Sequence, residues 1–150
     1  MAVDVSKLKT PKEAQNLMDN ARRMGREDVY QAAFARKCEL ESDGQDDPND
    51  PLVRDFWMTV AAYEQLLSEK NERRTAASRT RQKVSKDGIL ATVQSWARKR
   101  EPTMGFELLS QAGQWKLTGE YLVLKHAHRF DPADVESARD RLNGRGFKRE

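Results

Sequence analysis

The chain has 150 residues, of which 37% are apolar and 34% are charged, and its formal net charge at pH 7 is +3. This length predicts about one domain, and the charged share exceeds the roughly 25% of an average globular domain. Cys38 is the only cysteine, which excludes an internal disulfide and a thiolate metal cluster within one chain.

The N-terminal sequence, residues 1–13, lacks the continuous apolar run of a signal peptide. A stretch of about 18 apolar residues, which a membrane-spanning helix needs, occurs nowhere in the chain. We therefore expect a soluble, cytoplasmic protein with no membrane partner.

Positive charge is concentrated in the middle of the chain. Residues 69–100 carry ten Lys or Arg against three Asp or Glu, whereas residues 1–65 carry nine against 13 and residues 101–150 carry eight against eight. A concentrated positive segment is typical of proteins that bind phosphate, because each neutralised phosphate releases counterions. A solvated helix face or a flexible charged linker would show the same composition.

The first two predicted helices follow from clear terminal signals. The segment from Thr10 to Glu13 combines a capping threonine, a proline at the first helical position and a glutamate that closes a capping box. It predicts a helix over residues 11–24, which Gly25 would end. A second helix begins at Glu27, and because the connection is so short, the two helices must form an antiparallel hairpin.

A third helix is predicted after the polar, acidic loop of residues 42–50, with Asp50 as its cap and Pro51 at its first position. It has the most apolar face in the chain, so we expect it to be the spine of the core. That face consists of Val53, Phe56, Trp57, Val60, Tyr63, Leu66 and Leu67. Residues 68–83 have almost nothing to bury and indicate either a solvated extension of this helix or a linker.

Three further elements are expected in the C-terminal half. A fourth helix would start near Ser85 and end in the basic residues 98–100, where cations favour the helix dipole. A fifth would cover residues 103–113, and a last one would start at Asp131. Between them, the run EYLVLK at residues 120–125 is rich in Tyr, Leu and Val, which predicts a small β-hairpin near residues 115–125.

Together these signals predict a mainly α fold, a bundle of about six helices with one small β-hairpin. We expect a three-helix unit over residues 1–70, a basic connector or helix extension over residues 71–85, and a helical unit with the hairpin over residues 86–150. The order of helix, turn, helix and hairpin looks like the later part of a winged-helix domain at the level of fold analogy. The helix in the recognition position has Glu107 and no Lys or Arg, so packing suits it better than entry into a major groove.

Common catalytic motifs are absent: there is no nucleophile elbow, Walker loop, dinucleotide-binding glycine pattern or zinc-protease histidine pair. His126 and His128 would share one face of a continued strand near Asp131, but no third metal ligand is apparent. Glu120 and Lys125 would face opposite sides of that strand and so make no compact nuclease pair. We therefore expect no catalytic residue, no metal and no cofactor.

The leading hypothesis is a non-enzymatic nucleic-acid-binding protein, for DNA more than RNA, that contacts phosphates through its basic middle. Arginines interleaved with Thr and Ser suit this role, since guanidinium and hydroxyl groups both donate to phosphate oxygens. The predicted contact residues are Arg73, Arg74, Arg79, Arg81, Lys83, Lys86, Arg98, Lys99 and Arg100.

Two alternatives stay open. A helical protein-interaction adaptor, self-associating or binding a protein partner through the N-terminal unit, would follow if the apolar face of the third helix exceeded what the core can cover. A nuclease-type enzyme would first show as convergence of Glu107, Glu120, His126 and His128 in one cleft.

Overall fold

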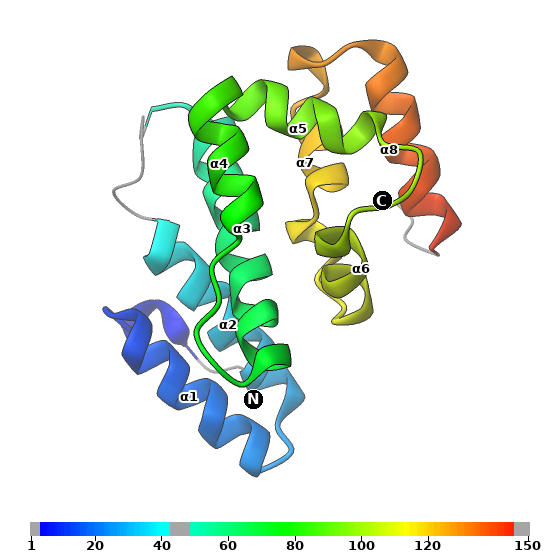
Figure 1. The fold of residues 1–150 in the computed structure, drawn as a ribbon. Coiled ribbons are helices and arrows are strands. Elements are labelled where there is room, and N and C mark those ends of the chain that lie inside the picture. Colours follow the sequence, from blue (N-terminus) through cyan, green and yellow to red (C-terminus); the bar gives the residue numbers. More distant parts are fainter. Residues whose placement is uncertain (1–3, 43–48, 146–150) are drawn as a thin grey trace.

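The computed structural model describes residues 4–42 and 49–145, most of which lie in helices (Figure 1). The α-helices are α1 (Pro11–Arg23), α2 (Glu27–Ser42), α3 (Pro51–Asn71), α4 (Ser78–Asp87), α5 (Ile89–Arg98), α6 (Met104–Gln111), α7 (Gly119–Lys125) and α8 (Pro132–Gly144). Three short 3-10 helices cover Val5–Lys7, Trp115–Leu117 and Ala127–Arg129. The mainly α prediction is confirmed, although the described residues form eight α-helices rather than about six. None of these helices has the length and apolar character needed to cross a membrane.

The β-hairpin predicted near residues 115–125 is wrong. Residues 115–117 make a 3-10 turn, and the EYLVLK run lies in α7, whose first turn is capped by Thr118. Because Leu122, Val123 and Leu124 are all buried, α7 is surrounded by other elements, and such a short apolar run has no period that separates a helix from a strand. Residues 115–125 therefore contain no strand, and the winged-helix analogy lacks its wing.

The α1–α2 hairpin follows its local signals. Thr10 and Glu13 form the predicted capping box, with the Thr10 hydroxyl accepting from the Glu13 amide and the Glu13 carboxylate accepting from the Thr10 amide. Gly25 follows α1 with φ +67°, a left-handed conformation that glycine adopts without steric cost. The acidic loop of residues 42–50, which follows α2, lies partly outside the described residues, which resume at Asn49.

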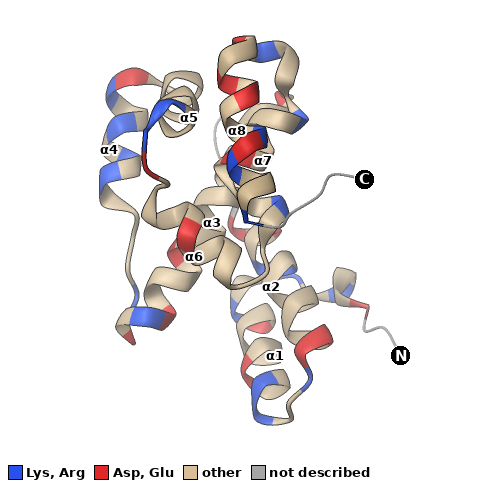
Figure 2. Cartoon of the chain, turned by 90° about the vertical axis from the view of Figure 1, so that its right-hand side faces the viewer, with Lys and Arg blue, Asp and Glu red and all other residues tan. Residues whose placement is uncertain are grey.

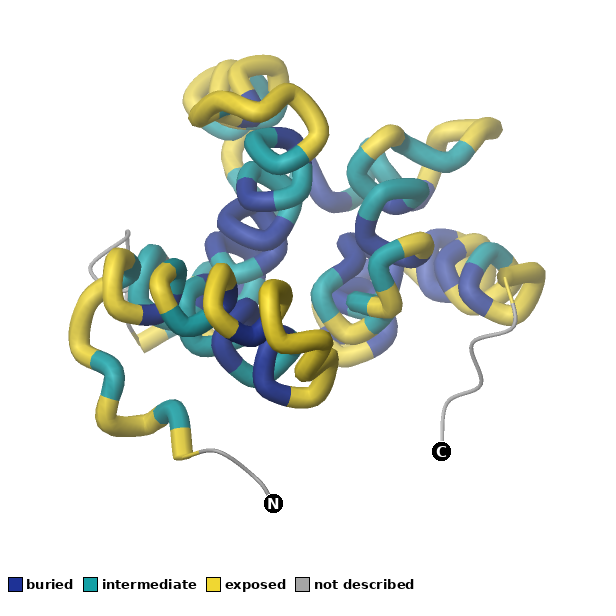
Figure 3. The backbone as a smooth tube through the Cα atoms, turned by 90° about the horizontal axis from the view of Figure 1, so that it is seen from below, coloured by how far each residue is buried: buried dark blue, intermediate teal, exposed yellow. Residues whose placement is uncertain are grey.

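Helix α3 is the centre of the molecule because it contributes to two hydrophobic clusters. Phe56 and Val60 pack with α5, α6, α7 and α8, whereas Ala61 and Ala62 pack with α1 and α2. Buried positions accordingly lie toward the interior of the molecule, and exposed positions lie mainly at its periphery (Figure 3). Helices α2, α6 and α7 contact α3, helices α5 and α8 contact α7, and α1 packs mainly on α2.

A single glycine separates α4 from α5. Gly88 has φ +89° and ψ 169°, a combination that is essentially restricted to glycine, and an added Cβ would meet nothing within 4 Å. The turn therefore depends on backbone conformation and not on a lack of space. In Figure 1, α5 leaves this turn and crosses the top of the molecule toward α8.

We expect Gly88→Ala to destabilise the protein by about 1–3 kcal/mol, because alanine is strained in this backbone region. Gly144→Ala is the matched control. Gly144 is helical, has no positive φ and has open space around it, so this change should be neutral or slightly stabilising. Urea unfolding of both variants would measure the difference, and equal stabilities would contradict the assigned strain.

Candidate functional site

Polar contacts attach α4 to α3. Helix α4 has no buried residue, but Glu64 of α3 accepts from the Ala77 amide at 2.8 Å and from Arg81 at 2.7 and 2.8 Å. The Arg81 guanidinium also lies 5.4 Å from the centre of the Trp57 ring, a cation–π geometry. Glu64 thus supplies the acidic group that the start of α4 lacks in its own sequence.

Glu64 is held in its ionised form by these contacts. Burial alone would raise the pKa of this carboxyl, but hydrogen bonds from Arg81 and from the Ala77 amide outweigh burial and lower the pKa below its ordinary value. The pair therefore contributes to folding while Glu64 is charged.

The other cations of α4 lie on a different helical face from Arg81. Arg79, Lys83 and Lys86 follow one another at four- and three-residue spacing and so share one helical face, opposite to Arg81. Figure 2 shows basic positions on successive turns of α4, with an acidic one only at its C-terminal end. That acid, Asp87, pairs with Lys83 at 2.8 Å, but both side chains are exposed, so the pair is weak.

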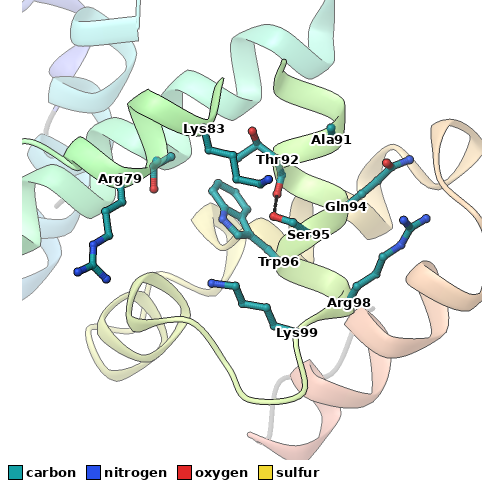
Figure 4. Close-up of a pocket in the computed structure, with 10 residues that line it drawn as sticks. Arg79, Lys83, Ala91, Thr92, Gln94, Ser95, Trp96, Arg98 and Lys99 are labelled. Atoms are coloured by element: carbon teal, nitrogen blue, oxygen red, sulfur yellow. Dashed lines mark hydrogen bonds between the residues drawn. The ribbon is translucent and has the colours of Figure 1, made fainter. Parts of the chain in front are cut away.

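A pocket of about 630 Å³ lies in the corner between α4 and α5 (Figure 4). We call it the corner pocket. Lys83 and Lys99 approach the Trp96 indole within this pocket, and Arg79 extends from α4 at its edge. Its lining residues are Arg79, Thr80, Lys83, Ala91, Thr92, Gln94, Ser95, Trp96, Arg98 and Lys99. Basic side chains separated by up to 20 positions in sequence thus meet around one tryptophan.

Two neighbours fix the position of Trp96. Its ring stacks on Phe56 with a centroid distance of 5.6 Å and an interplanar angle of 14°. It also lies against the backbone of Gly119, where an added Cβ would stand 2.4 Å from the indole. Since no side chain fits between them, glycine at the first position of α7 allows this close approach.

The end of α5 is held by Arg141 of α8. Its guanidinium donates to the backbone oxygens of Trp96 at 3.0 Å and Lys99 at 2.5 Å, and to the Glu120 carboxylate at 2.8 Å. The Glu120 side chain is 2% exposed and that of Arg141 is 11% exposed. Burial raises the pKa of Glu120 above its ordinary range, and the contact with Arg141 opposes that rise.

A second pocket, of about 490 Å³, continues from the corner pocket toward α3, α6 and α7. We call it the inner pocket. Its lining residues are Thr59, Val60, Tyr63, Arg79, Thr80, Trp96, Lys99, Thr103, Met104, Gly105, Phe106, Leu109, Gly119 and Glu120. Arg79, Thr80, Trp96 and Lys99 line both pockets, so the two cavities share a border.

The nine residues predicted to contact phosphate separate into three groups. Arg79, Lys83, Arg98 and Lys99 line the corner pocket. Arg81 is engaged with Glu64. Arg98 lines the pocket but donates to Asp134 at 2.9 Å and to Asp131 at 3.0 Å. Its side chain points away from Trp96 in Figure 4. Arg73, Arg74, Lys86 and Arg100 are exposed and line neither of the two pockets.

Arg74 lies instead in a separate, polar pocket of about 830 Å³ beside α3, which Glu64 and Glu69 also line. Glu41 is a third acid at this pocket, and Lys12, Lys37 and Arg81 also line it, so its positive and negative charges nearly balance. Of the nine residues, the structure thus brings Lys83 and Lys99 together beside Trp96, with Arg79 at the edge of the same pocket.

Sequence reasoning did not identify Trp96 as a pocket residue, because the candidate residues were selected for positive charge. Thr80, Gln94 and Ser95 were missed as lining residues as well. The available signal was a tryptophan inside a basic segment, an arrangement used by proteins that bind single-stranded nucleic acid.

Three of the four residues named for an enzymatic site have separate partners, and the ring of the fourth, His128, lies 6.4 Å from that of His126. Glu120 pairs with Arg141, Glu107 with Arg145, and buried His126 lies 2.7 Å from Asp55. Across residues 4–42 and 49–145 no group of three or more His, Cys, Asp or Glu side chains could hold a metal ion.

Comparisons with protein-family models, curated protein sequences and solved structures found no match to this chain. Its function is therefore inferred from its residues and their geometry.

We expect Arg141→Met to destabilise the protein by about 3 kcal/mol, since it leaves the Glu120 carboxylate buried without its partner. The double variant Glu120→Gln/Arg141→Met buries no charge and should recover part of that loss. Urea unfolding of the single and double variants would measure this, and a double variant no more stable than Arg141→Met would contradict the assigned cost.

The Glu64 contact predicts a pH-dependent contribution to stability. Because the folded-state pKa of Glu64 is lowered, the contribution is present above the unfolded-state pKa and is lost as the pH falls through the lowered folded-state pKa. Arg81→Met should therefore cost about 1 kcal/mol or less at pH 7, given that Arg81 is 45% exposed. The difference from wild type should shrink in acid, and a difference independent of pH would argue against the pair.

Proposed function

We propose that this protein is a non-enzymatic nucleic-acid-binding protein whose phosphate contacts come from the corner pocket. The observation that carries the proposal is the meeting of Arg79 and Lys83 of α4 with Lys99, which follows α5, around Trp96. Within the described part of the chain, Arg79 and Lys99 make no ion pair that would neutralise them. Their charge is therefore available to an anionic ligand.

The donor types around the pocket suit phosphate. Arg79 offers a planar fork of donors, and Lys83 and Lys99 offer compact charges that adapt to a bridging or terminal oxygen. Thr80 and Gln94 add neutral donors at the same cavity. Such contacts position a nucleic acid backbone without reading its sequence.

The adaptor alternative has less support. It was motivated by an excess of apolar surface on α3, whereas Phe56 and Val60 are buried by other helices. In the residues that the structure describes, the large apolar side chains classed as exposed are Met24 and Met104. Met24 lies at the end of α1 and Met104 lies in α6, so the two do not form an extended apolar face.

The enzymatic alternative also lacks its motivating feature, because Glu107, Glu120 and His126 each contact a different partner. A phosphate-binding cavity without an adjacent carboxylate cluster favours binding over metal-dependent cleavage.

The proposal is tested by removing the three cations together. We expect Arg79→Ala/Lys83→Ala/Lys99→Ala to weaken binding of fluorescent oligonucleotides and to reduce the slope of log affinity against log salt by about two to three units, roughly one unit per lost contact. Anisotropy titrations with single-stranded DNA, double-stranded DNA and RNA at two salt concentrations would measure both quantities.

The matched control is Arg54→Ala/Lys9→Ala/Lys116→Ala, which removes the same charge from exposed positions that line neither pocket. It should keep most of the affinity and the slope. The proposal is overturned if the wild type binds none of the three polymers, or if both triple variants lose affinity equally.

A further inference from the structure

The inner pocket is placed to receive a group attached to whatever the corner pocket holds. Arg79, Lys99 and Trp96 border both cavities. A ligand with its phosphate at these cations would have its neighbouring group directed along Trp96 toward the inner pocket. The chemistry of the inner pocket therefore indicates what that neighbouring group is.

Six of the 14 residues that line the inner pocket are apolar or aromatic. Val60, Phe106 and Leu109 are buried, and the Tyr63 ring is partly exposed beside Gly105. Met104, 56% exposed, stands at the same pocket and would be covered by an apolar occupant. The volume of about 490 Å³ lies within the range of about 300–1,000 Å³ that small-molecule sites have.

Gly105 lies beside the Tyr63 ring. A Cβ at this position would stand 3.5 Å from the ring, in ordinary van der Waals contact. A longer side chain at position 105 would therefore extend along the ring and take up volume in the inner pocket. Thr59, Thr103 and Glu120 also line the cavity, so a flat group with a polar edge would meet both aromatic and polar residues.

We infer that the inner pocket holds one unpaired nucleobase, and that the ligand of the two pockets is a single-stranded nucleic acid. This inference rests on the proposed function, since it assigns the phosphate to the corner pocket. A nucleobase has the required flat face and polar edge, and its own backbone supplies the anion at Arg79 and Lys99. A paired base would have to leave its duplex to enter a cavity enclosed by α3, α5, α6 and α7.

The test compares three ligands with the same phosphate backbone. These are a short oligothymidine, an abasic strand of equal length and a duplex containing the same strand. We expect the wild type to bind the oligothymidine about tenfold or more tightly than the abasic strand, as base stacking on aromatic side chains contributes that much. The duplex should bind more weakly than the oligothymidine.

A variant that fills the inner pocket separates the two sites. Gly105→Leu adds a side chain over Tyr63 and should remove the preference for the oligothymidine while keeping the affinity for the abasic strand. Arg79→Ala/Lys99→Ala should weaken both strands. Tyr63→Leu, which removes the aromatic face without adding volume, should also reduce the preference and serves if Gly105→Leu does not fold by circular dichroism.

The two failures are distinguishable. Equal wild-type affinities for the oligothymidine and the abasic strand would overturn the base pocket. Tighter binding to the duplex than to the oligothymidine would overturn it too. Both results would leave the proposed phosphate contacts standing. An unchanged preference in both Gly105→Leu and Tyr63→Leu would overturn the assignment of the base to this cavity. Absence of binding to all three ligands would overturn the proposed function itself.

Discussion

The buried pair of Glu120 and Arg141 is the constraint on which the candidate site depends. A carboxylate that is 2% exposed is costly unless a cation lies against it, and here the cation comes from α8. Arg141 has further donors, which reach the backbone oxygens of Trp96 and Lys99 at the end of α5, where helical carbonyls have no partner of their own. One guanidinium thus joins α7, α8 and α5, and it fixes the backbone that carries Trp96 and Lys99.

The two helices of the corner are held very differently. Helix α5 buries Thr92, Val93 and Ala97 and is also held by Arg141. Helix α4 has no buried residue and is held by the Glu64–Arg81 pair, by partly buried Val84 and by the turn at Gly88. Arg81 and Arg98 are consequently engaged in ion pairs with other helices or the residues before them, whereas Arg79 and Lys99 have no ion pair among the described residues and are left for an anionic ligand. The basic residues of this segment therefore have two roles, ion pairing within the fold and contact with a ligand. The contacts of each side chain show which role it has.

What the sequence could predict was determined by local chemistry. The capping box at Thr10 and the proline at Pro51 act within one helical turn, and the predicted helices begin where these residues place them. Helix α7 was mistaken for a strand since its conformation depends on helices distant in sequence that bury it on several sides. The role of Arg81 could not be predicted either, because its partner Glu64 lies 17 positions away on another helix. The predicted phosphate contacts and the expected absence of catalysis stay predictions.

The difference in attachment between α4 and α5 also has a consequence for binding. A helix without buried residues opens at low free energy compared with the core, so Arg79 and Lys83 are on the less stable side of the corner and Lys99 is on the more stable side. A phosphate bound between them contacts both helices only when α4 is docked. By mass action such a ligand stabilises the docked state, and part of its binding free energy is used to order α4. Phosphate contacts alone should then give modest, salt-dependent affinity, and tight binding requires a second, largely salt-independent contribution from a group that enters the apolar inner pocket.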